Sequence, residues 1–155
     1  MYRNVIIIFI FCQLFVFAAC TKHLSNDLNN GQQGYADSQV VGQWKVTAYT
    51  SSAPFDWNND GSPETNIFNT WTACEKNNLY QFNPDKTGQF KVNCSLSGPG
   101  TWQIINTLYL YYTLTGQSPD GDKIISMTSV EFKTTRDVTV TTGQNLTLTK
   151  TWTRQ

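Results

Sequence analysis

Apolar and polar residues alternate along most of the chain after residue 40. This two-residue period is typical of strands that bury one face. Gly, Asn, Asp and Pro residues separate eight such segments; they are residues 41–50, 78–83, 88–94, 100–105, 108–115, 123–133, 136–141 and 144–153. No segment shows the apolar spacing of a long helix, so the pattern predicts an all-β domain.

Short connections between these segments predict antiparallel hairpins. We expect tight turns at residues 84–87, 106–107 and 142–143, where the residue types favour them. Eight antiparallel strands in sequence suffice to close an up-and-down barrel, which leaves no exposed sheet edge. The interior of such a barrel holds either its own side chains or one small ligand.

The alternation also indicates which residues share a face of a strand. In the last segment Leu146, Leu148 and Trp152 share one face with Lys150. In residues 108–115 two sets compete for the interior, and the sequence leaves open which one wins; they are Leu108, Leu110, Tyr112 and Leu114 on one face, and Tyr109 and Tyr111 on the other.

The start of the chain has a different pattern. Residues 5–19 are apolar except for Gln13, follow a single basic residue, Arg3, and end in small residues. This is the anatomy of a secretory signal. The apolar run is short for a transmembrane span, which needs roughly 20 residues. We therefore expect residues 1–19 to be a signal peptide that is removed, and Cys12 with it.

Cys20 follows Ala18 and Ala19 directly. This placement resembles the lipobox of bacterial lipoproteins, which implies that Cys20 carries lipid and becomes the new N-terminus. The alternative is a secreted protein with a free Cys20. A lipid anchor would attach the protein to a membrane, and we expect the bacterial cell envelope, at the outer membrane. Residues 20–38 contain the lipidated cysteine and a polar, flexible tether, and residues 39–155 form the barrel domain.

The charge balance offers little to a polyanionic partner. The chain has 11 basic and 11 acidic residues, and loss of Arg3 with the signal leaves 10 and 11, a formal charge of −1. We expect no nucleic acid partner and a monomer. The single histidine, His23, lies in the tether. The domain therefore lacks the commonest general base, and we expect no enzyme.

Cys74 and Cys94 remain as a pair in an exported chain and predict a disulfide. Cys74 lies just before the predicted hairpin of residues 78–94 and Cys94 lies at its end, so the two cysteines can approach each other. Closing a loop of this length would destabilise the unfolded chain by roughly 3 kcal/mol. A zinc site needs more ligands than two cysteines without a nearby histidine.

Residues 56–66, DWNNDGSPETN, match the first half of a calcium-binding loop, D-x-[DN]-x-[DN]-G. The oxygen ligands expected for Ca²⁺ are Asp56, Asn58, Asp60, the backbone carbonyl of Ser62, Glu64 and Asn66. Ile67 stands where a bidentate Glu is expected. The alternative is an Asx-rich loop whose side chains cap their own backbone. Bound calcium would fasten the connection rather than catalyse a reaction.

Several short motifs occur in a fixed order. They are G-x-W at Gly42 and Trp44, A-C-E-K at residues 73–76, F-N-x-D-x-T-G at 82–88, G-T-W at 100–102, and Arg154 at the end of the last strand. The combination resembles the lipocalin-like domain lipoproteins common in Bacteroidota. The resemblance implies an eight-stranded antiparallel up-and-down barrel. It also implies that Trp44 closes one barrel end with Arg154 packed over it, a structural role.

The resemblance implies a lipid-anchored binding module of the envelope that holds a small hydrophobic or amphipathic ligand. The alternative is a structural or protein-interaction domain with a packed barrel and a calcium-stabilised loop.

Overall fold

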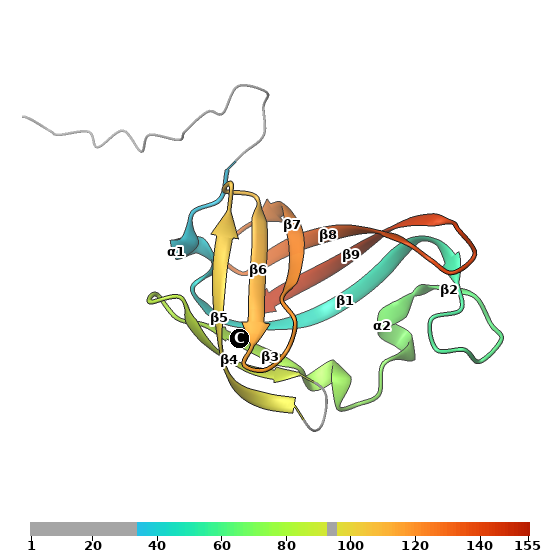
Figure 1. Cartoon of the computed structure of the whole chain (residues 1–155), viewed down its shortest axis with the longest axis horizontal. Helices are drawn as coiled ribbons and strands as arrows, with labels where there is room; N and C mark the ends of the chain where they lie inside the picture. Colours follow the sequence, from blue (N-terminus) through green and yellow to red (C-terminus); the bar gives the residue numbers. More distant parts are fainter. Residues whose placement is uncertain (1–33, 93–95) are drawn as a thin grey trace, which may run out of the picture.

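The computed structural model describes residues 34–92 and 96–155. These residues form one antiparallel sheet that closes on itself, because each of the eight barrel strands pairs with the next barrel strand and β9 also pairs with β1 (Figure 1). The eight barrel strands are β1 (Gly42–Phe55), β3 (Leu79–Phe82), β4 (Thr87–Val92), β5 (Leu96–Ile105), β6 (Tyr109–Leu114), β7 (Asp120–Met127), β8 (Glu131–Thr139) and β9 (Asn145–Arg154). The predicted eight-stranded up-and-down barrel is confirmed.

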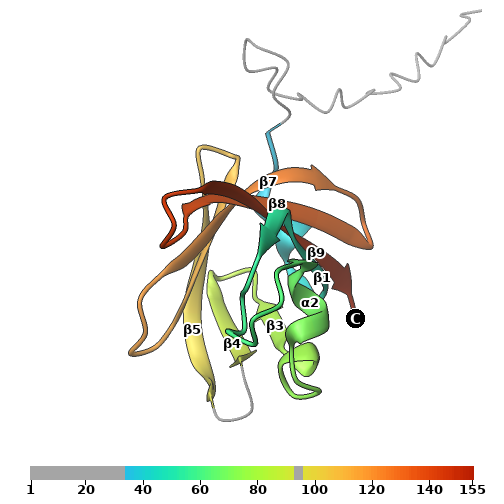
Figure 2. The same ribbon diagram turned by 90° about the vertical axis from the view of Figure 1, so that its right-hand side faces the viewer.

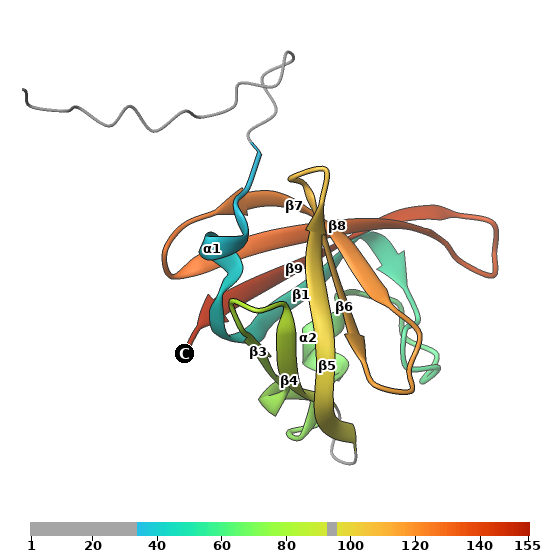
Figure 3. The same cartoon turned by 60° about the vertical axis from the view of Figure 1, so that its left-hand side comes forward.

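Short elements are added at both ends of the barrel. Helix α1 (Asp37–Val40) lies beside the start of β1 and the C-terminus (Figure 3). Strand β2 (Glu64–Asn66), helix α2 (Ile67–Thr70) and the 3-10 helix η1 (Glu75–Asn77) belong to the long connection between β1 and β3. Across the described ranges, no helix has the length and apolar character needed to cross a membrane.

The three predicted hairpin turns are confirmed. Asn106 and Thr107, between β5 and β6, both have positive φ, 51° and 57°, as a two-residue hairpin turn requires. Between β8 and β9, Gly143 has φ 82°. At residues 84–87, the backbone N–H of Asn83 donates to the Thr87 carbonyl at 2.9 Å and joins β3 to β4.

The predicted break between strands at residues 134–135 is wrong. The sequence pattern separated residues 123–133 from 136–141, but the structure turns at residues 128–130, between β7 and β8. This turn contains no Gly, Pro, Asn or Asp. Thr128 stabilises the turn instead. Its hydroxyl accepts a hydrogen bond from the backbone N–H of Glu131 at 3.0 Å and donates one to the Glu131 carbonyl at 2.9 Å. Thr134 therefore lies inside a strand and is fully buried.

Aromatic rings fill most of the barrel interior. Trp152 stacks on Phe132, with ring centroids 5.2 Å apart, and meets Tyr80 edge-on at 4.9 Å. Tyr112 is buried beside them while Tyr109 is exposed. The face of β6 that carries Leu110 and Tyr112 is therefore the one that turns inward.

A second apolar cluster lies beyond the barrel. The β8–β9 hairpin and the second half of β1 project past the other strands, and α2 packs beneath them (Figures 1 and 2). Ile67, Leu146 and Leu148 are buried there against partly buried aromatic residues that include Trp71. This cluster fixes the long β1–β3 connection at one mouth of the barrel.

Candidate functional site

The end of the barrel beside α1, called the closed end, is filled by side chains. Trp44 is fully buried, and its Nε1 donates to the Val40 carbonyl at 2.7 Å. The guanidinium of Arg154 lies 4.3 Å from the centroid of the Trp44 ring. Arg154 also donates from Nη1 to the Val41 carbonyl at 2.8 Å and from Nε to the Ser129 carbonyl at 2.7 Å. The structure thus brings Trp44 and Arg154 together where a resemblance had placed them.

Gly42 makes this arrangement possible. Its φ is +133°, and a Cβ at this position would overlap the guanidinium of Arg154. A side chain there would therefore strain the backbone and displace the arginine. The G-x-W motif thus combines a position that must lack a side chain with the tryptophan that the arginine covers.

Contacts with the barrel begin before residue 39, the boundary expected from the sequence. Tyr35 is buried, and its backbone N–H donates to the Thr107 carbonyl at 2.7 Å. Helix α1 follows and buries Val40 completely. These residues cover the closed end, so a ligand would enter from the opposite end.

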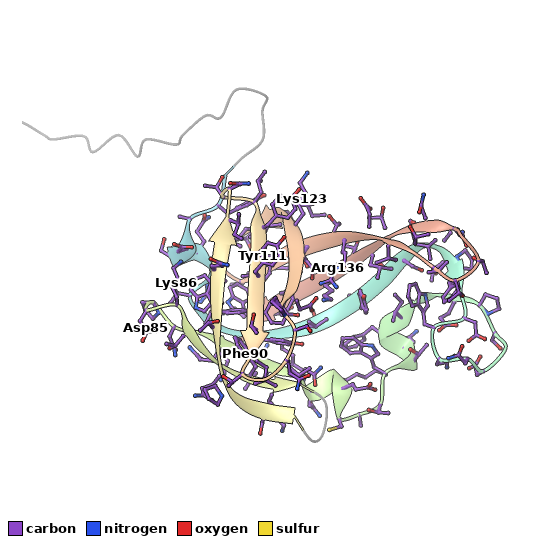
Figure 4. The ribbon with its side chains drawn as sticks, viewed as in Figure 1. Asp85, Lys86, Phe90, Tyr111, Lys123 and Arg136 are labelled. Atoms are coloured by element: carbon purple, nitrogen blue, oxygen red, sulfur yellow. The ribbon has the colours of Figure 1, made fainter. Side chains whose placement is uncertain are left out.

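That opposite end, called the open end, holds a cavity of about 390 Å³. Its volume falls in the lower part of the usual range for small-molecule sites. Tyr80, Phe90, Tyr112 and Val46 line its inner part, and Trp71 and Leu114 contribute apolar surface; the polar lining residues are Glu75, Asn78, Gln117, Ser118, Asp120, Arg136 and Lys150. Figure 4 labels two lining residues, Phe90 on β4 and Arg136 on β8.

Four charged side chains meet at one wall of the cavity and are called the charge cluster: Asp120 and Asp122 on β7, Arg136 on β8, and Lys150 on β9. The Lys150 Nζ lies 3.0 Å from Asp122 and 3.4 Å from Asp120. The Arg136 Nη2 lies 2.7 Å from Asp122 and also pairs with Asp120. Each cation therefore contacts both carboxylates, and the formal charges sum to zero.

The charge cluster lies where β7 and β8 separate. Their pairing runs from Met127↔Phe132 to Lys123↔Thr135 and then stops, although β8 continues to Thr139. Arg136 spans the gap, and its Nε donates to the Gly121 carbonyl at 3.1 Å. A side chain thus satisfies a backbone acceptor that the neighbouring strand leaves unpaired.

Hydrogen bonds join the charge cluster to the aromatic interior. The Tyr112 hydroxyl donates to Asp120 at 2.6 Å. The Thr134 hydroxyl donates to Asp122 at 3.3 Å and accepts from the Trp152 Nε1 at 3.0 Å. Two hydroxyls and an indole therefore extend the charge cluster into a continuous network behind the cavity, and such networks hold side chains in one geometry.

The environment shifts the pKa of several of these groups. Burial opposes ionisation of Asp120, but Lys150, Tyr112 and Arg136 outweigh it and lower the pKa of Asp120 to about 2. Burial likewise opposes the charge on Lys150, and the two carboxylates outweigh it and raise its pKa. Burial raises the pKa of Tyr112 well above its usual value, with the nearby Tyr80 and Asp120 adding to the effect. At neutral pH, Asp120 and Lys150 are ionised and Tyr112 is a neutral donor.

We expect the contribution of Asp120 to stability to disappear in acid. Its pKa falls from 3.8 to about 2 on folding. The stabilisation is therefore present above about pH 4 and is lost as the pH falls through about 2. Asp120 is one-third exposed, so we expect a loss of about 1 kcal/mol after screening by solvent. Urea unfolding of the protein and of Asp120→Asn should differ less at about pH 2 than at about pH 6, and an equal difference at both would contradict this.

The loop predicted to bind calcium, residues 56–66, caps its own backbone. The Asp56 carboxylate accepts the backbone N–H of Asp60 at 3.0 Å and that of Gly61 at 2.9 Å. Asp60 in turn accepts the backbone N–H of Ser62 at 2.8 Å. These contacts are those of the Asx-rich alternative.

The other expected calcium ligands have similar partners. Asn58 donates to Asp60 at 2.9 Å, and Glu64 accepts the backbone N–H of Trp57 at 3.2 Å. Asn66 caps α2 by accepting the backbone N–H of Asn69 at 3.2 Å. Within residues 34–92 and 96–155, no three or more His, Cys, Asp or Glu residues are grouped so that they could hold a metal ion. Calcium binding at this loop stays a prediction.

The predicted cysteine sites fall partly outside the described residues. Cys74 lies at the start of η1. Cys94, its expected disulfide partner, and Cys20, the expected lipidation site, lie outside the described residues. The disulfide and the lipid therefore stay predictions.

Sequence reasoning missed the charge cluster. The sequence pattern left Asp120 and Asp122 in the connection between residues 108–115 and 123–133, but the structure places them at the start of β7. The two-residue period carries a signal. Asp120 and Asp122 share a strand face with buried Ile124, and Lys150 shares one with Leu148 and Trp152. The sequence pattern therefore indicated inward-facing charged residues on several strands, but it did not indicate which of them form ion pairs.

Comparisons with known proteins gave one family match and several similar structures. A family model described as a lipocalin-like domain matches residues 40–136. Among solved structures, bovine odorant-binding protein in complex with undecanal is similar at 13% identity and a TM-score of 0.43, over 80% of this chain and 76% of that chain. A deswapped triple mutant of that bovine protein matches at 13% identity and a TM-score of 0.41, over 76% and 74%. A search of curated proteins found no match.

Proposed function

Because the chain belongs to the lipocalin-like domain family, we propose that it is a binding module that holds one small amphipathic molecule in the cavity at its open end. The observation that carries this proposal is the cavity itself, about 390 Å³ in volume, with aromatic walls and a charge cluster at one side. A barrel that served only as a structural domain would need no such space, since its side chains could fill it.

The lining suits a molecule with an apolar body and a polar end. Tyr80, Phe90 and Leu114 offer apolar contact, whereas Asp120 and Arg136 offer hydrogen-bond partners at one wall. Burying a methylene group contributes about 0.8 kcal/mol, and immobilising the ligand offsets part of the gain. A chain of about eight carbons should therefore bind with a Kd in the micromolar to millimolar range.

The proposal includes attachment to the bacterial cell envelope through lipid on Cys20. Its support is the sequence alone, in which an apolar signal of residues 5–19 ends in two alanines directly before this cysteine. The folded domain would then remain in water beside the membrane. The mass of the mature protein purified from a bacterium should show acyl chains on Cys20, and an unmodified thiol at the mature N-terminus would contradict the anchor.

We expect saturable binding of N-phenyl-1-naphthylamine, a neutral apolar dye whose fluorescence increases in an apolar site. Leu114→Trp adds bulk at the cavity lining and should weaken dye binding by about tenfold or more, because overfilling a site removes the contacts available to a ligand. Fluorescence titration of the full-length protein and of the variant measures both constants.

The matched control is Ile105→Trp, which makes a similar change at an exposed position on β5. It should leave the dye affinity within about twofold, because Ile105 does not line the cavity. Equal weakening by both substitutions, or no saturable binding by the unmodified protein, would contradict ligand binding in this cavity.

A further inference from the structure

The charge cluster exposes two opposite charges at the cavity, whereas its other two members are largely buried. The side chains of Asp122 and Lys150 are 4% and 13% exposed, whereas those of Arg136 and Asp120 are 38% and 35% exposed. A ligand's polar end at this wall therefore meets a guanidinium and a carboxylate that already pair with each other.

The exposed pair is held in place from behind. Lys150 contacts both carboxylates, at 3.4 Å from Asp120 and 3.0 Å from Asp122. The Tyr112 hydroxyl donates to Asp120 at 2.6 Å, and Arg136 donates to the Gly121 carbonyl at 3.1 Å. Asp120 and Arg136 therefore cannot separate without breaking bonds to three strands.

A charged ligand end fits this wall poorly. A carboxylate placed on Arg136 would lie beside Asp120, and an ammonium placed on Asp120 would lie beside Arg136. Attraction to one partner is then offset by repulsion from the other, while the ion still loses its hydration. Glu75 and Lys150 also line the cavity. Their charges are opposite, so the charged lining as a whole favours neither anions nor cations.

A neutral group that both donates and accepts fits without this conflict. A hydroxyl or a primary amide can accept a hydrogen bond from Arg136 and donate one to Asp120. The bonds to charged partners are stronger than those between neutral groups. The pairing of Asp120 with Arg136 is not disrupted in that geometry.

We propose, on the basis of the binding function above, that the cavity selects ligands whose polar end is uncharged and can both donate and accept hydrogen bonds, such as alcohols and primary amides. Carboxylates and amines with the same apolar chain are discriminated against. The charge cluster thus acts as a filter on ligand charge, and the aromatic walls bind the apolar body.

Three probes that differ only in the polar end test this selection. Titration of the full-length protein at pH 7 with 1-octanol, octanoate and octylamine, by displacement of N-phenyl-1-naphthylamine, should give a Kd for octanol at least about fivefold lower than for either ion. Octanoate or octylamine binding as tightly as octanol overturns the selection while cavity binding stands. Displacement by none of the three, with no saturable dye binding, overturns both proposals.

Two variants that each remove one charge give an independent readout. Asp120→Asn leaves the charge cluster with a formal charge of +1, and the octanoate-to-octanol affinity ratio should rise by about fivefold or more. Arg136→Gln leaves it at −1, and the octylamine-to-octanol ratio should rise instead. Ratios that stay unchanged in both folded variants, verified by circular dichroism, overturn the role of the charge cluster. The three-probe comparison on the unmodified protein holds even if a variant fails to fold.

Discussion

Replacing Trp44 with alanine is expected to lower the free energy of unfolding by about 3–5 kcal/mol, the usual cost of removing a buried tryptophan. The side chain is fully buried and meets Phe132 edge-on at a centroid distance of 4.6 Å. Its loss would leave a void at the closed end. It would also leave the Val40 carbonyl without the donor that now lies 2.7 Å away, and Arg154 without the ring beneath it.

Urea unfolding followed by circular dichroism measures this loss. Trp44→Phe keeps a ring but removes the indole donor, so its cost should be clearly smaller. Trp57→Ala serves as the matched control, because Trp57 is only half-buried and its Nε1 has no hydrogen-bond partner among the described residues. A cost below about 1 kcal/mol for Trp44→Ala, or a cost equal to that of Trp57→Ala, would show that the closed end does not depend on this ring.

The second large effect is expected from Lys150→Met. The change keeps a side chain of similar length but removes a cation that lies within 3.4 Å of both Asp120 and Asp122. Asp122 is almost fully buried. Removing one partner from buried ions costs about 3–5 kcal/mol when the remaining charge is left unpaired. Arg136 still contacts both carboxylates and the charge cluster is left at −1, so we expect a loss at the lower end of this range, about 3 kcal/mol. Urea unfolding at pH 7 should show a loss of this size.

The matched control for Lys150 is Lys133→Met on β8. The Lys133 Nζ lies 3.7 Å from Glu131, and both side chains are nearly half exposed. Such surface pairs contribute at most about 1 kcal/mol, so we expect little change. Adding Asp122→Asn to Lys150→Met should recover part of the lost stability, because it removes the excess negative charge and leaves Asp120 paired with Arg136. Failure to recover any, or equal costs for the two lysines, would contradict a buried ionic interaction.

The stabilisation by Lys150 also has a defined pH range. Its pKa is raised on folding, so its contribution is fully present below the ordinary lysine value of about 10.4 and is lost only at higher pH. Asp120 limits the range on the acid side. The charge cluster therefore keeps these two charges over the whole neutral range, which the proposed selection among ligand ends requires.

Much of the barrel could be predicted from local patterns. Alternation placed Leu146, Leu148 and Trp152 on one inward face, and all three are buried. Turn residues at 106–107 and 142–143 marked two hairpins. Where the turn lacked such residues, at 128–130, the prediction misplaced the strand ends. A threonine hydroxyl can close a turn as well as a glycine can, but threonine is common in strands too.

The loop of residues 56–66 shows a different limit. The spacing of Asp56, Asn58 and Asp60 suits calcium and also suits backbone capping, because both need oxygen atoms that converge on a small volume. The sequence therefore left two alternatives. The hydrogen bonds that Asp56 and Asp60 accept from backbone N–H groups are those of backbone capping.

The sequence by itself determined the fold class, the number of barrel strands and the inward face of the last strand, since each depends on residues that are neighbours along the chain. Only the tertiary structure decided that Asp120, Asp122, Arg136 and Lys150 meet beside a cavity. Lys150 lies 28 positions from Asp122, and alternation gives the face of a residue but not its partner. The register between strands sets the partner. Shifts near Val46 and Ile124 adjust that register by amounts that no local pattern encodes.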